Sequence, residues 1–453
     1  ARRPGADLGR LYDTPAQQIG DERVPVVVLP GILGTKLNHR ETGLKIWGAF
    51  TREASDADTA QGARDIALPM VPGQTLAALQ DDSVPDDVLD FIVADVGPLR
   101  GIKVGAYVDI LMTLAAGKYR DRSLGESGAI DYGGQHYTCF QYPYDWRRDV
   151  SESAVALHAM IADAQQRVRE GRGLPGDAPV KVDIVAHSMG GLVLRYYLRY
   201  GTQPLPEDGS LPTLNWAGAR NIERAFLIGT PSAGSVESLQ QLVDGLDLNP
   251  LFPNYRPGVL GTMPSIYQLL PRPRQARVVD AATGEPIDVL DVATWQQYGW
   301  GLAGSGRELD RTLGWLLPDA ASDAQRREIA LDHLTKCLAR AEQFFRAIDV
   351  PASPPAGTEL FLFAGDGDDT SSVLAVDPPT GRITVREEAP GDGTVTRASA
   401  LMDERTGGAW VAGLRSPIDW HRVQFLNEDH LGLTKSVEFS DNLLYLMLEA
   451  PRD

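Results

Sequence analysis

Runs of apolar residues, most of them closed by glycine, proline or asparagine, recur along the whole chain and predict the strands of a sheet. Most of these runs are apolar throughout, which is typical of strands that are buried on both faces. The predicted strands cover residues 24–31, 137–146, 180–187, 222–231, 359–367 and 420–427.

Apolar residues at helical spacing fill several of the gaps between these strands. They predict amphipathic helices over residues 151–171, 190–201 and 331–348. Strands that alternate with helices build a mostly parallel sheet with helices on both faces, so the predicted fold class is α/β.

Two long segments interrupt the alternation. Residues 48–135 are rich in Asp, Ala, Gly and Pro, with a short amphipathic stretch over 104–119, and residues 235–350 hold further helices. We interpret both as excursions from one sheet rather than as separate domains. The predicted organisation is a loose polar arm over residues 1–22, followed by a single domain over 23–453.

The sequence "VDIVAHSMGGLVLRYYL" (182–198) predicts a sharp elbow between a strand and a helix, with Ser188 at its tip. Such an elbow needs small residues two positions before and after the serine, and Ala186 and Gly190 stand there. The turn presents the serine hydroxyl above the sheet, while the backbone N–H of Met189 is free to donate to an oxyanion. Ser188 is therefore the predicted nucleophile.

A serine nucleophile needs a base, and in this architecture the base follows it along the chain. His333, His421 and His430 follow Ser188 at a suitable distance. His333 lies in a helical pattern and His421 opens a strand, whereas His430 lies in a loop from which its ring can reach a serine. We expect His430 to be the base and His187, beside Ser188, to have a structural role.

The acid that orients the base is less clear from spacing alone. Asp366, Asp368 and Asp369 form one cluster after the fifth predicted strand, and Asp392 stands between two glycines further on. Spacing slightly favours Asp392, because flanking glycines let a carboxylate approach a histidine closely. The first cluster has no closing glutamate at the spacing of a calcium loop, so no metal site is predicted.

A second turn carries candidate chemistry after the first strand, in "VVLPGILGTKL" (27–37). Backbone N–H groups in such a glycine-containing turn provide the other half of an oxyanion hole.

The composition and net charge limit the classes of molecule that the protein is expected to bind. The 453 residues carry a net charge of −18, spread along the chain, which disfavours nucleic acid and anionic lipid surfaces. No apolar run reaches 18 residues, so no transmembrane helix is predicted.

The only two cysteines, Cys139 and Cys337, are expected to be free buried thiols, although the sequence does not decide whether they pair. A soluble, cytoplasmic chain is favoured over a secreted one, and the oligomeric state is left open.

Seven motifs in order resemble the lecithin:cholesterol acyltransferase family, which includes lysosomal phospholipase A2 and phospholipid:diacylglycerol acyltransferases. They span about residues 24–433 and read "VVVLPGILGTKL", "IWG", "PYDWRRD", "AHSMGGLVLRYYL", "IGTPSAGS", "GDGTV" and "DHLGL". Animal members close a loop in the first excursion with a disulfide, whereas this chain has no cysteine before Cys139.

The resemblance implies an α/β-hydrolase fold with a cap insertion at about 48–135 and a lid insertion at about 235–350. It implies a triad of Ser188, Asp392 and His430. The same resemblance assigns the oxyanion hole to the N–H groups of Ile32 and Met189. It also suggests that Trp47 contacts the acyl chain, and Leu33 is expected to bind substrate as well. In "YDWR" (144–147), Asp145 and Arg147 are expected to form a structural ion pair.

The expected function is therefore that of a serine hydrolase that attacks acyl esters without a cofactor, and lipid esters of the lipase or phospholipase type are the expected substrates. The acyl group then passes to water or to an alcohol. Water is favoured because the sequence shows no recognisable binding site for an acceptor alcohol. Two alternatives stay open: an esterase or lactone-opening enzyme that acts on a metabolite other than a lipid, and an inactive lipid- or protein-binding module.

Overall fold

The computed structural model describes most of the chain, and all structural statements below concern these residues. The described residues are 7–51, 54–89, 91–94, 102–105, 107–247, 253–275, 277–405 and 411–452. Residues 1–6 of the predicted arm lie outside them.

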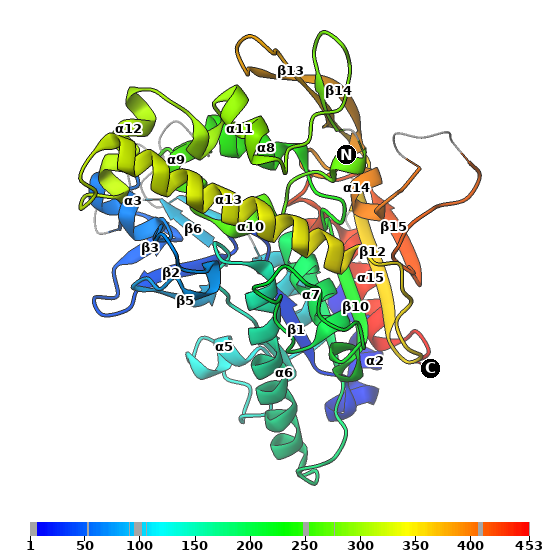
Figure 1. Cartoon of the computed structure of the whole chain (residues 1–453). Coiled ribbons are helices and arrows are strands. Elements are labelled where there is room, and N and C mark those ends of the chain that lie inside the picture. The colour runs from blue at the N-terminus through cyan, green and yellow to red at the C-terminus, as the bar shows by residue number, and fades with distance from the viewer. Residues whose placement is uncertain are drawn as a thin grey trace.

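A six-stranded parallel sheet forms the centre of the molecule, and each strand falls within one of the six predicted segments (Figure 1). Its order is β15-β12-β10-β9-β1-β8. The strands are β1 (Val26–Leu29), β8 (Cys139–Gln141), β9 (Val182–His187), β10 (Ile222–Ile228), β12 (Glu359–Gly365) and β15 (Arg422–Leu426).

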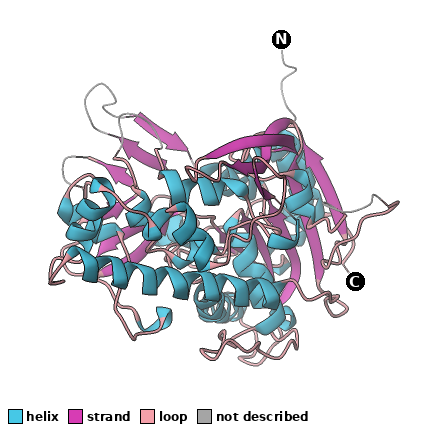
Figure 2. Cartoon of the chain, turned by 45° about the horizontal axis from the view of Figure 1, so that its top comes forward, coloured by secondary structure: helices cyan, strands magenta, loops and turns pink. Residues whose placement is uncertain are grey.

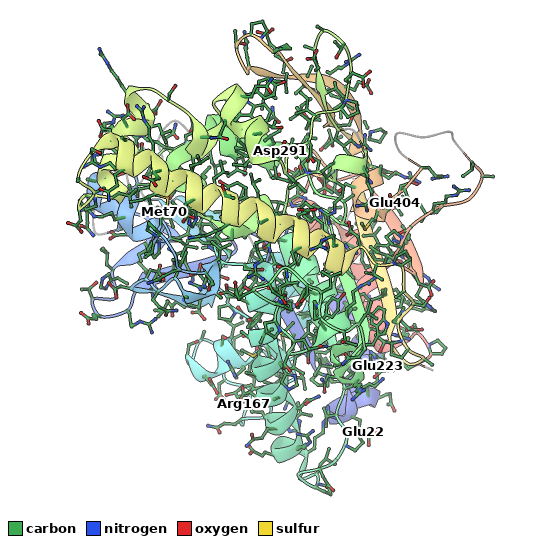
Figure 3. All side chains as sticks on the ribbon, in the orientation of Figure 1. Glu22, Met70, Arg167, Glu223, Asp291 and Glu404 are labelled. Carbon is green, nitrogen blue, oxygen red and sulfur yellow. The ribbon has the colours of Figure 1, made fainter. Side chains whose placement is uncertain are left out.

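Helices cover both faces of this sheet, as the continuous apolar runs predict (Figure 2). Successive side chains of a strand point to opposite faces. Val27 and Leu29 accordingly belong to one hydrophobic cluster with α6 (Val150–Arg172) and α7 (Met189–Tyr200). Val26 and Val28 belong to a second cluster, which includes residues of α2 (Asp13–Ile19), α4 (Val108–Ala116) and α15 (Val437–Leu448). Figure 3 shows side chains filling the space between these helices and the sheet.

The predicted loose arm is helical from Leu8 onward and anchored at Tyr12 and Ala16, which corrects the expectation that it is loose. It forms α1 (Leu8–Leu11) and α2, and Tyr12 between them is only 3% exposed. The Tyr12 hydroxyl donates to the carboxylate of Asp441 on α15, at 2.6 Å. A few apolar residues thus dock an otherwise polar segment.

The segment between β1 and β8 contains two small sheets, which the sequence patterns do not predict. One has the order β3-β2-β5 and the other β4-β6-β7. Their strands are β2 (Thr35–His39), β3 (Lys45–Trp47), β4 (Ala49–Phe50), β5 (Ser83–Val88), β6 (Phe91–Ala94) and β7 (Ile102–Gly105). The segment also holds α3 (Ala60–Ile66), α4 and α5 (Arg122–Glu126).

The segment between β10 and β12 is mostly helical, as predicted. Its helices are α8 (Val236–Asp244), α9 (Pro257–Leu260), α10 (Pro264–Tyr267), α11 (Val292–Tyr298), α12 (Arg307–Leu316) and α13 (Asp323–Ile348). The longest of them, α13, crosses the molecule in Figure 1. None of the helices in the described part of the chain is long and apolar enough to span a bilayer.

A third departure from the main sheet lies between β12 and β15. Strands β13 (Asp368–Val376) and β14 (Ile383–Gly391) form an antiparallel hairpin at the top of Figure 1, and β11 (Val278–Asp280) pairs with β13. Asp392 follows β14 directly, so the hairpin leads into the site described below. A short helix, α14 (Arg397–Leu401), comes next.

Two further expectations are confirmed. Cys139 and Cys337 are both buried and free. Arg147 is fully buried and pairs with Asp145 at 2.7 Å and with Asp81 at 2.6 Å. Although burial alone would raise the pKa of Asp145, the Arg147 charge and its hydrogen bonds lower that pKa. The ion pair between Arg147 and Asp81 connects the segment before β5 to the loop after β8.

Candidate active site

Ser188 stands at a strained turn between β9 and α7. Its φ of 53° lies in the left-handed region, which non-glycine residues adopt only where the surrounding structure holds them there. The Ser188 N–H donates to the carbonyl of Ile228 at 2.7 Å, which fixes the turn against β10. The sequence predicts this elbow, and the structure contains it.

The small residues around the elbow are required by close approaches of the main chain. A Cβ on Gly190 would lie 2.5 Å from the carbonyl oxygen of Pro30, and one on Gly31 would lie 2.7 Å from the Ser188 Cβ. Both distances are shorter than real Cβ contacts. The turn after β1 therefore lies directly against the nucleophile elbow.

His430 and Asp392 meet Ser188 at this elbow. His430 Nε2 lies 3.0 Å from Ser188 Oγ, and His430 Nδ1 lies 2.8 Å from Asp392 Oδ2. Because a carboxylate oxygen only accepts, Nδ1 carries the proton and Nε2 is free to accept from the serine. The three side chains thus form one hydrogen-bonded chain, with the geometry of a nucleophile, a base and an orienting acid.

The Asp392 carboxylate is itself held from behind. Its Oδ1 accepts from the backbone N–H groups of Thr394 at 3.0 Å and Val395 at 2.7 Å, which leaves Oδ2 for the histidine. Asp392 is 2% exposed, so these bonds rather than water orient it.

The other candidates for base and acid lie elsewhere. His333 is buried on α13, where its Nε2 bonds the carbonyl of Thr262 at 3.0 Å. The His421 side chain is 47% exposed and pairs with Glu359. Asp366 pairs with Arg397 at 2.8 Å, while Asp368 and Asp369 lie exposed on β13.

The backbone N–H groups of Ile32 and Met189 flank Ser188 and are available. Within the described residues, neither has a hydrogen-bond partner. Met189 is the first residue of α7, where N–H groups lack partners inside the helix. Both N–H groups are therefore free to donate to a developing negative charge.

The main chain around Ile32 is pinned by aromatic side chains. The Tyr144 hydroxyl donates to the Pro30 carbonyl at 2.8 Å, and Trp47 Nε1 donates to the Leu33 carbonyl at 2.7 Å. Leu33 itself has a φ of 63°. These bonds keep the strained turn in place while the Ile32 N–H stays unpaired.

Trp47 and Leu33 are in contact, and the contact is a hydrogen bond from the Trp47 ring to the backbone carbonyl of Leu33. The Trp47 ring is 1% exposed and lies edge-on to Trp146 and Tyr255, at centroid distances of 5.6 and 5.5 Å. Trp47 thus supports the turn, and its contact with an acyl chain stays a prediction.

Sequence reasoning missed Tyr107, which precedes α4 and reaches the elbow from a distant part of the chain. Its hydroxyl lies 2.7 Å from the Gly31 nitrogen and 3.1 Å from His187 Nδ1. No motif marks this tyrosine, because its neighbours lie 76 and 80 positions away in sequence. Burial raises the pKa of Tyr107, which therefore stays protonated.

The parallel sheet, the strand–helix elbow and the three aligned side chains define an α/β-hydrolase fold with a candidate serine triad. In agreement with this, the model of the lecithin:cholesterol acyltransferase family matches residues 130–291, which confirms the resemblance over that part of the chain. The match supports an enzyme that acts on carboxylic esters, either an ester hydrolase or an O-acyltransferase. No curated protein matches the sequence.

The architecture is shared with a solved structure of low sequence identity. The crystal structure of the Tle4–Tli4 complex aligns with a TM-score of 0.57 at 13% identity, over 94% of this chain and 99% of that one. Lipase 1 from Pelosinus fermentans aligns at 14% identity and a TM-score of 0.35, over 95% and 99% of the two chains. At 13% identity, the similarity to the Tle4–Tli4 complex supports the fold alone.

Proposed function

We propose that this protein is a serine hydrolase that cleaves acyl esters of lipids through an acyl-enzyme on Ser188. The observation that carries the proposal is the unbroken hydrogen-bonded chain from Ser188 Oγ through His430 to Asp392. The family match over residues 130–291 supports a lipid ester as the substrate class.

In the acylation step, Ser188 Oγ attacks the ester carbonyl carbon while His430 Nε2 takes the hydroxyl proton. The electron pair of the carbonyl double bond moves to its oxygen, which then accepts from the N–H groups of Ile32 and Met189. In comparable enzymes, each such donor lowers the barrier by about 3 kcal/mol. Asp392 stabilises the imidazolium. As the carbonyl double bond re-forms, the bond from the carbon to the alcohol oxygen breaks, and the imidazolium gives its proton to that leaving oxygen.

In the second step, His430 deprotonates an incoming hydroxyl, whose oxygen bonds to the acyl carbon. The bond between that carbon and Ser188 Oγ then breaks, and His430 returns the proton to Oγ. Water yields a free acid, and we favour this outcome because water is always present. An alcohol yields a new ester, an outcome that the description of the matching family as an acyltransferase favours. Which acceptor wins depends on how well water is excluded from the acyl-enzyme.

We further propose that residues 48–135 and 235–350 serve as cap and lid of a single domain over 23–453. Leu33, which follows the proposed oxyanion donor Ile32, and Trp47, which donates to the Leu33 carbonyl, would then contribute to the wall of the acyl site.

The triad is tested by turnover of a fluorogenic long-chain ester, with matched controls from the rejected candidates. We expect Ser188→Ala and Asp392→Asn each to lower kcat by about 10⁴-fold or more, and His430→Gln similarly. The controls Asp366→Asn and His421→Gln should stay within about two-fold of the wild type. Equal losses in Asp366→Asn and Asp392→Asn would contradict the assignment of the acid.

The substrate class is tested with a series of acyl chain lengths in neutral, zwitterionic and anionic lipid dispersions. A lipid enzyme should gain kcat/KM with chain length, because each buried methylene contributes about 0.8 kcal/mol. Since the net charge is −18, anionic dispersions should be the poorest substrates. A preference for short esters or lactones would instead favour an esterase of small metabolites.

A further inference from the structure

A second hydrogen-bonded chain passes behind the nucleophile, through two buried side chains that the reaction scheme does not use. Tyr107 and His187 are 4% and 2% exposed. The Tyr107 hydroxyl lies 2.7 Å from the Gly31 nitrogen and 3.1 Å from His187 Nδ1. His187 Nε2 lies 3.0 Å from the backbone carbonyl oxygen of His430.

The partners fix the direction of every proton in this chain. A carbonyl oxygen only accepts, so His187 Nε2 carries a hydrogen and donates it to His430. Burial, together with the nearby His430, lowers the pKa of His187 to about 3, so its ring is neutral and Nδ1 has a lone pair. The Tyr107 hydroxyl therefore donates to Nδ1 and accepts from the Gly31 N–H.

The far end of the chain completes a clamp on the backbone of His430. The His430 N–H donates to the backbone carbonyl of Asp392 at 2.8 Å, while its carbonyl accepts from His187. Both polar groups of this main-chain unit are thus held, and the Asp392 carboxylate holds the ring. Without the His187 bond, His430 would lose one of its two backbone anchors.

The near end of the chain holds the turn that contains Ile32. Gly31 precedes Ile32, and its Cα lies so close to the elbow that an added Cβ would meet the Cβ of Ser188 at 2.7 Å. A shift of Gly31 would therefore move the Ile32 N–H relative to the serine. Tyr107 prevents such a shift by accepting from the Gly31 nitrogen.

We propose that Tyr107 and His187 are positioning residues that fix His430 and the turn at Gly31 relative to Ser188. This inference rests on the proposed function, and it adds a coupling between the base and the oxyanion turn. Their side chains hydrogen-bond each other and the main chain of Gly31 and His430, so they act through these two backbones. Displacements of about 1 Å in such sites cost up to about 10²-fold in rate.

Three substitutions separate the two ends of the chain. Tyr107→Phe removes the hydroxyl and keeps the ring. His187→Gln can place an amide N–H near the position of Nε2, which keeps the bond to His430, whereas the shorter His187→Asn reaches only the Tyr107 end. The matched control is Tyr197→Phe, which breaks another tyrosine–histidine pair, with His158 at 3.0 Å.

Kinetics on a soluble ester, with thermal unfolding measured in parallel, provide the first readout. We expect kcat to fall about ten-fold or more in Tyr107→Phe and His187→Asn at unchanged KM, below the unfolding temperature. His187→Gln should recover to within about three-fold, and Tyr197→Phe should stay within about two-fold. Values of kcat within two-fold of the wild type in both Tyr107→Phe and His187→Asn would overturn the proposal.

Nitrogen-15 NMR of labelled histidines provides a readout that needs no turnover. At pH 7 we expect His187 to be neutral with its proton on Nε2, and the Nδ1–H signal of His430 to shift in Tyr107→Phe but not in Tyr197→Phe. A proton on Nδ1 of His187, or an unchanged His430 signal, would contradict the proposal. If the wild type hydrolyses no ester, the proposed function fails while this measurement still decides the positioning role.

Discussion

At the scale of single residues, Gly190 tests the packing of the elbow, and Gly314 is a helical glycine with open space around it that serves as the contrast. Gly190 on α7 would bring a Cβ within 2.5 Å of the Pro30 carbonyl oxygen and 3.0 Å of that of Leu29, whereas nothing lies within 4 Å of a Cβ on Gly314 of α12. Gly190→Ala must displace the main chain, so we expect it to lose activity and stability. Gly314→Ala should stabilise the protein by about 0.5–1 kcal/mol.

Urea denaturation and ester turnover of both variants check this prediction. A Gly190→Ala variant with wild-type activity and stability would mean that the turn after β1 does not lie against the elbow.

The residues at the elbow show which parts of the candidate active site can be predicted from the sequence. Ser188 is marked by local chemistry, because the turn itself demands Ala186 and Gly190. His430 follows from chain order and its loop position. Asp392 could not be separated from Asp366 by spacing alone, since the choice depends on how the β13–β14 hairpin returns to the sheet. Tyr107 carries no local mark at all.

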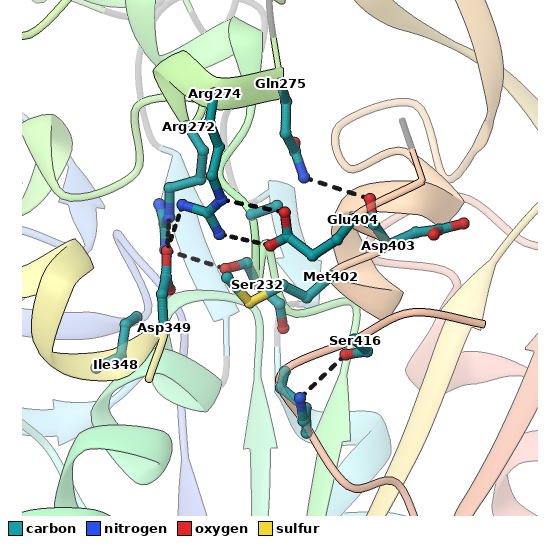
Figure 4. A network of polar contacts seen from close by, with 12 residues as sticks. Ser232, Arg272, Arg274, Gln275, Ile348, Asp349, Met402, Asp403, Glu404 and Ser416 are labelled. Carbon is teal, nitrogen blue, oxygen red and sulfur yellow. Dashed lines mark hydrogen bonds and ion pairs between the residues drawn. The ribbon is translucent and has the colours of Figure 1, made fainter. Parts of the chain in front are cut away.

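At the scale of elements, an ion-pair network with a buried centre at Arg272 and Asp349 joins the segment after α10 to the end of α13 (Figure 4). Arg272 is fully buried and pairs with Asp349 at 2.8 Å, while its guanidinium lies 3.7 Å from the centre of the Phe345 ring. Arg274 bridges the same Asp349 and Glu404, in the loop after α14. Asp349 therefore links three segments that are distant in sequence.

Asp349→Asn should lower the free energy of unfolding by about 3 kcal/mol, because it leaves the buried Arg272 guanidinium without its carboxylate. The control Asp332→Asn breaks an exposed pair with Lys336 on the same helix and should cost at most about 0.5 kcal/mol. Chemical denaturation of both variants measures the difference. Equal effects would show that the network adds nothing beyond a surface ion pair.

The elements that were predicted and those that were missed differ in what buries them. All six strands of the central sheet fall within predicted segments, and five of them are buried along most of their length, which makes them largely apolar; β15 is mostly part-exposed. Strand β14 was not predicted, since most of its residues are exposed and its sequence, "ITVREEAPG", lacks a buried face. Likewise α13 begins at Asp323 rather than near 331, because its first turns are charged and only the Ser322 cap marks their start.

At the scale of the whole molecule, buried histidines make stability depend on pH. Burial lowers the pKa of His187 to about 3 and that of His333 to about 4. The unfolded chain takes up these protons near pH 6.5. Between about pH 6.5 and 4 the unfolded state therefore binds more protons, and the free energy of unfolding falls as the pH is lowered.

His333→Gln should remove one of these protons while its amide can still donate to the Thr262 carbonyl. We expect the dependence of the unfolding free energy on pH, between about 6 and 4.5, to become shallower by about 1.4 kcal/mol per pH unit. The wild type, measured over the same pH range, provides the reference slope. An unaltered slope in His333→Gln would mean that this histidine is protonated in the folded state.

The central claim is that Ser188 becomes acylated, and the most direct measurement is mass spectrometry after reaction with a fluorophosphonate. We expect a single adduct on the intact wild-type chain, located by peptide mapping on Ser188, with no adduct on Ser188→Ala and far slower labelling of His430→Gln. Labelling of Asp366→Asn should match the wild type. An unlabelled wild type, or an adduct that persists in Ser188→Ala, would contradict the account.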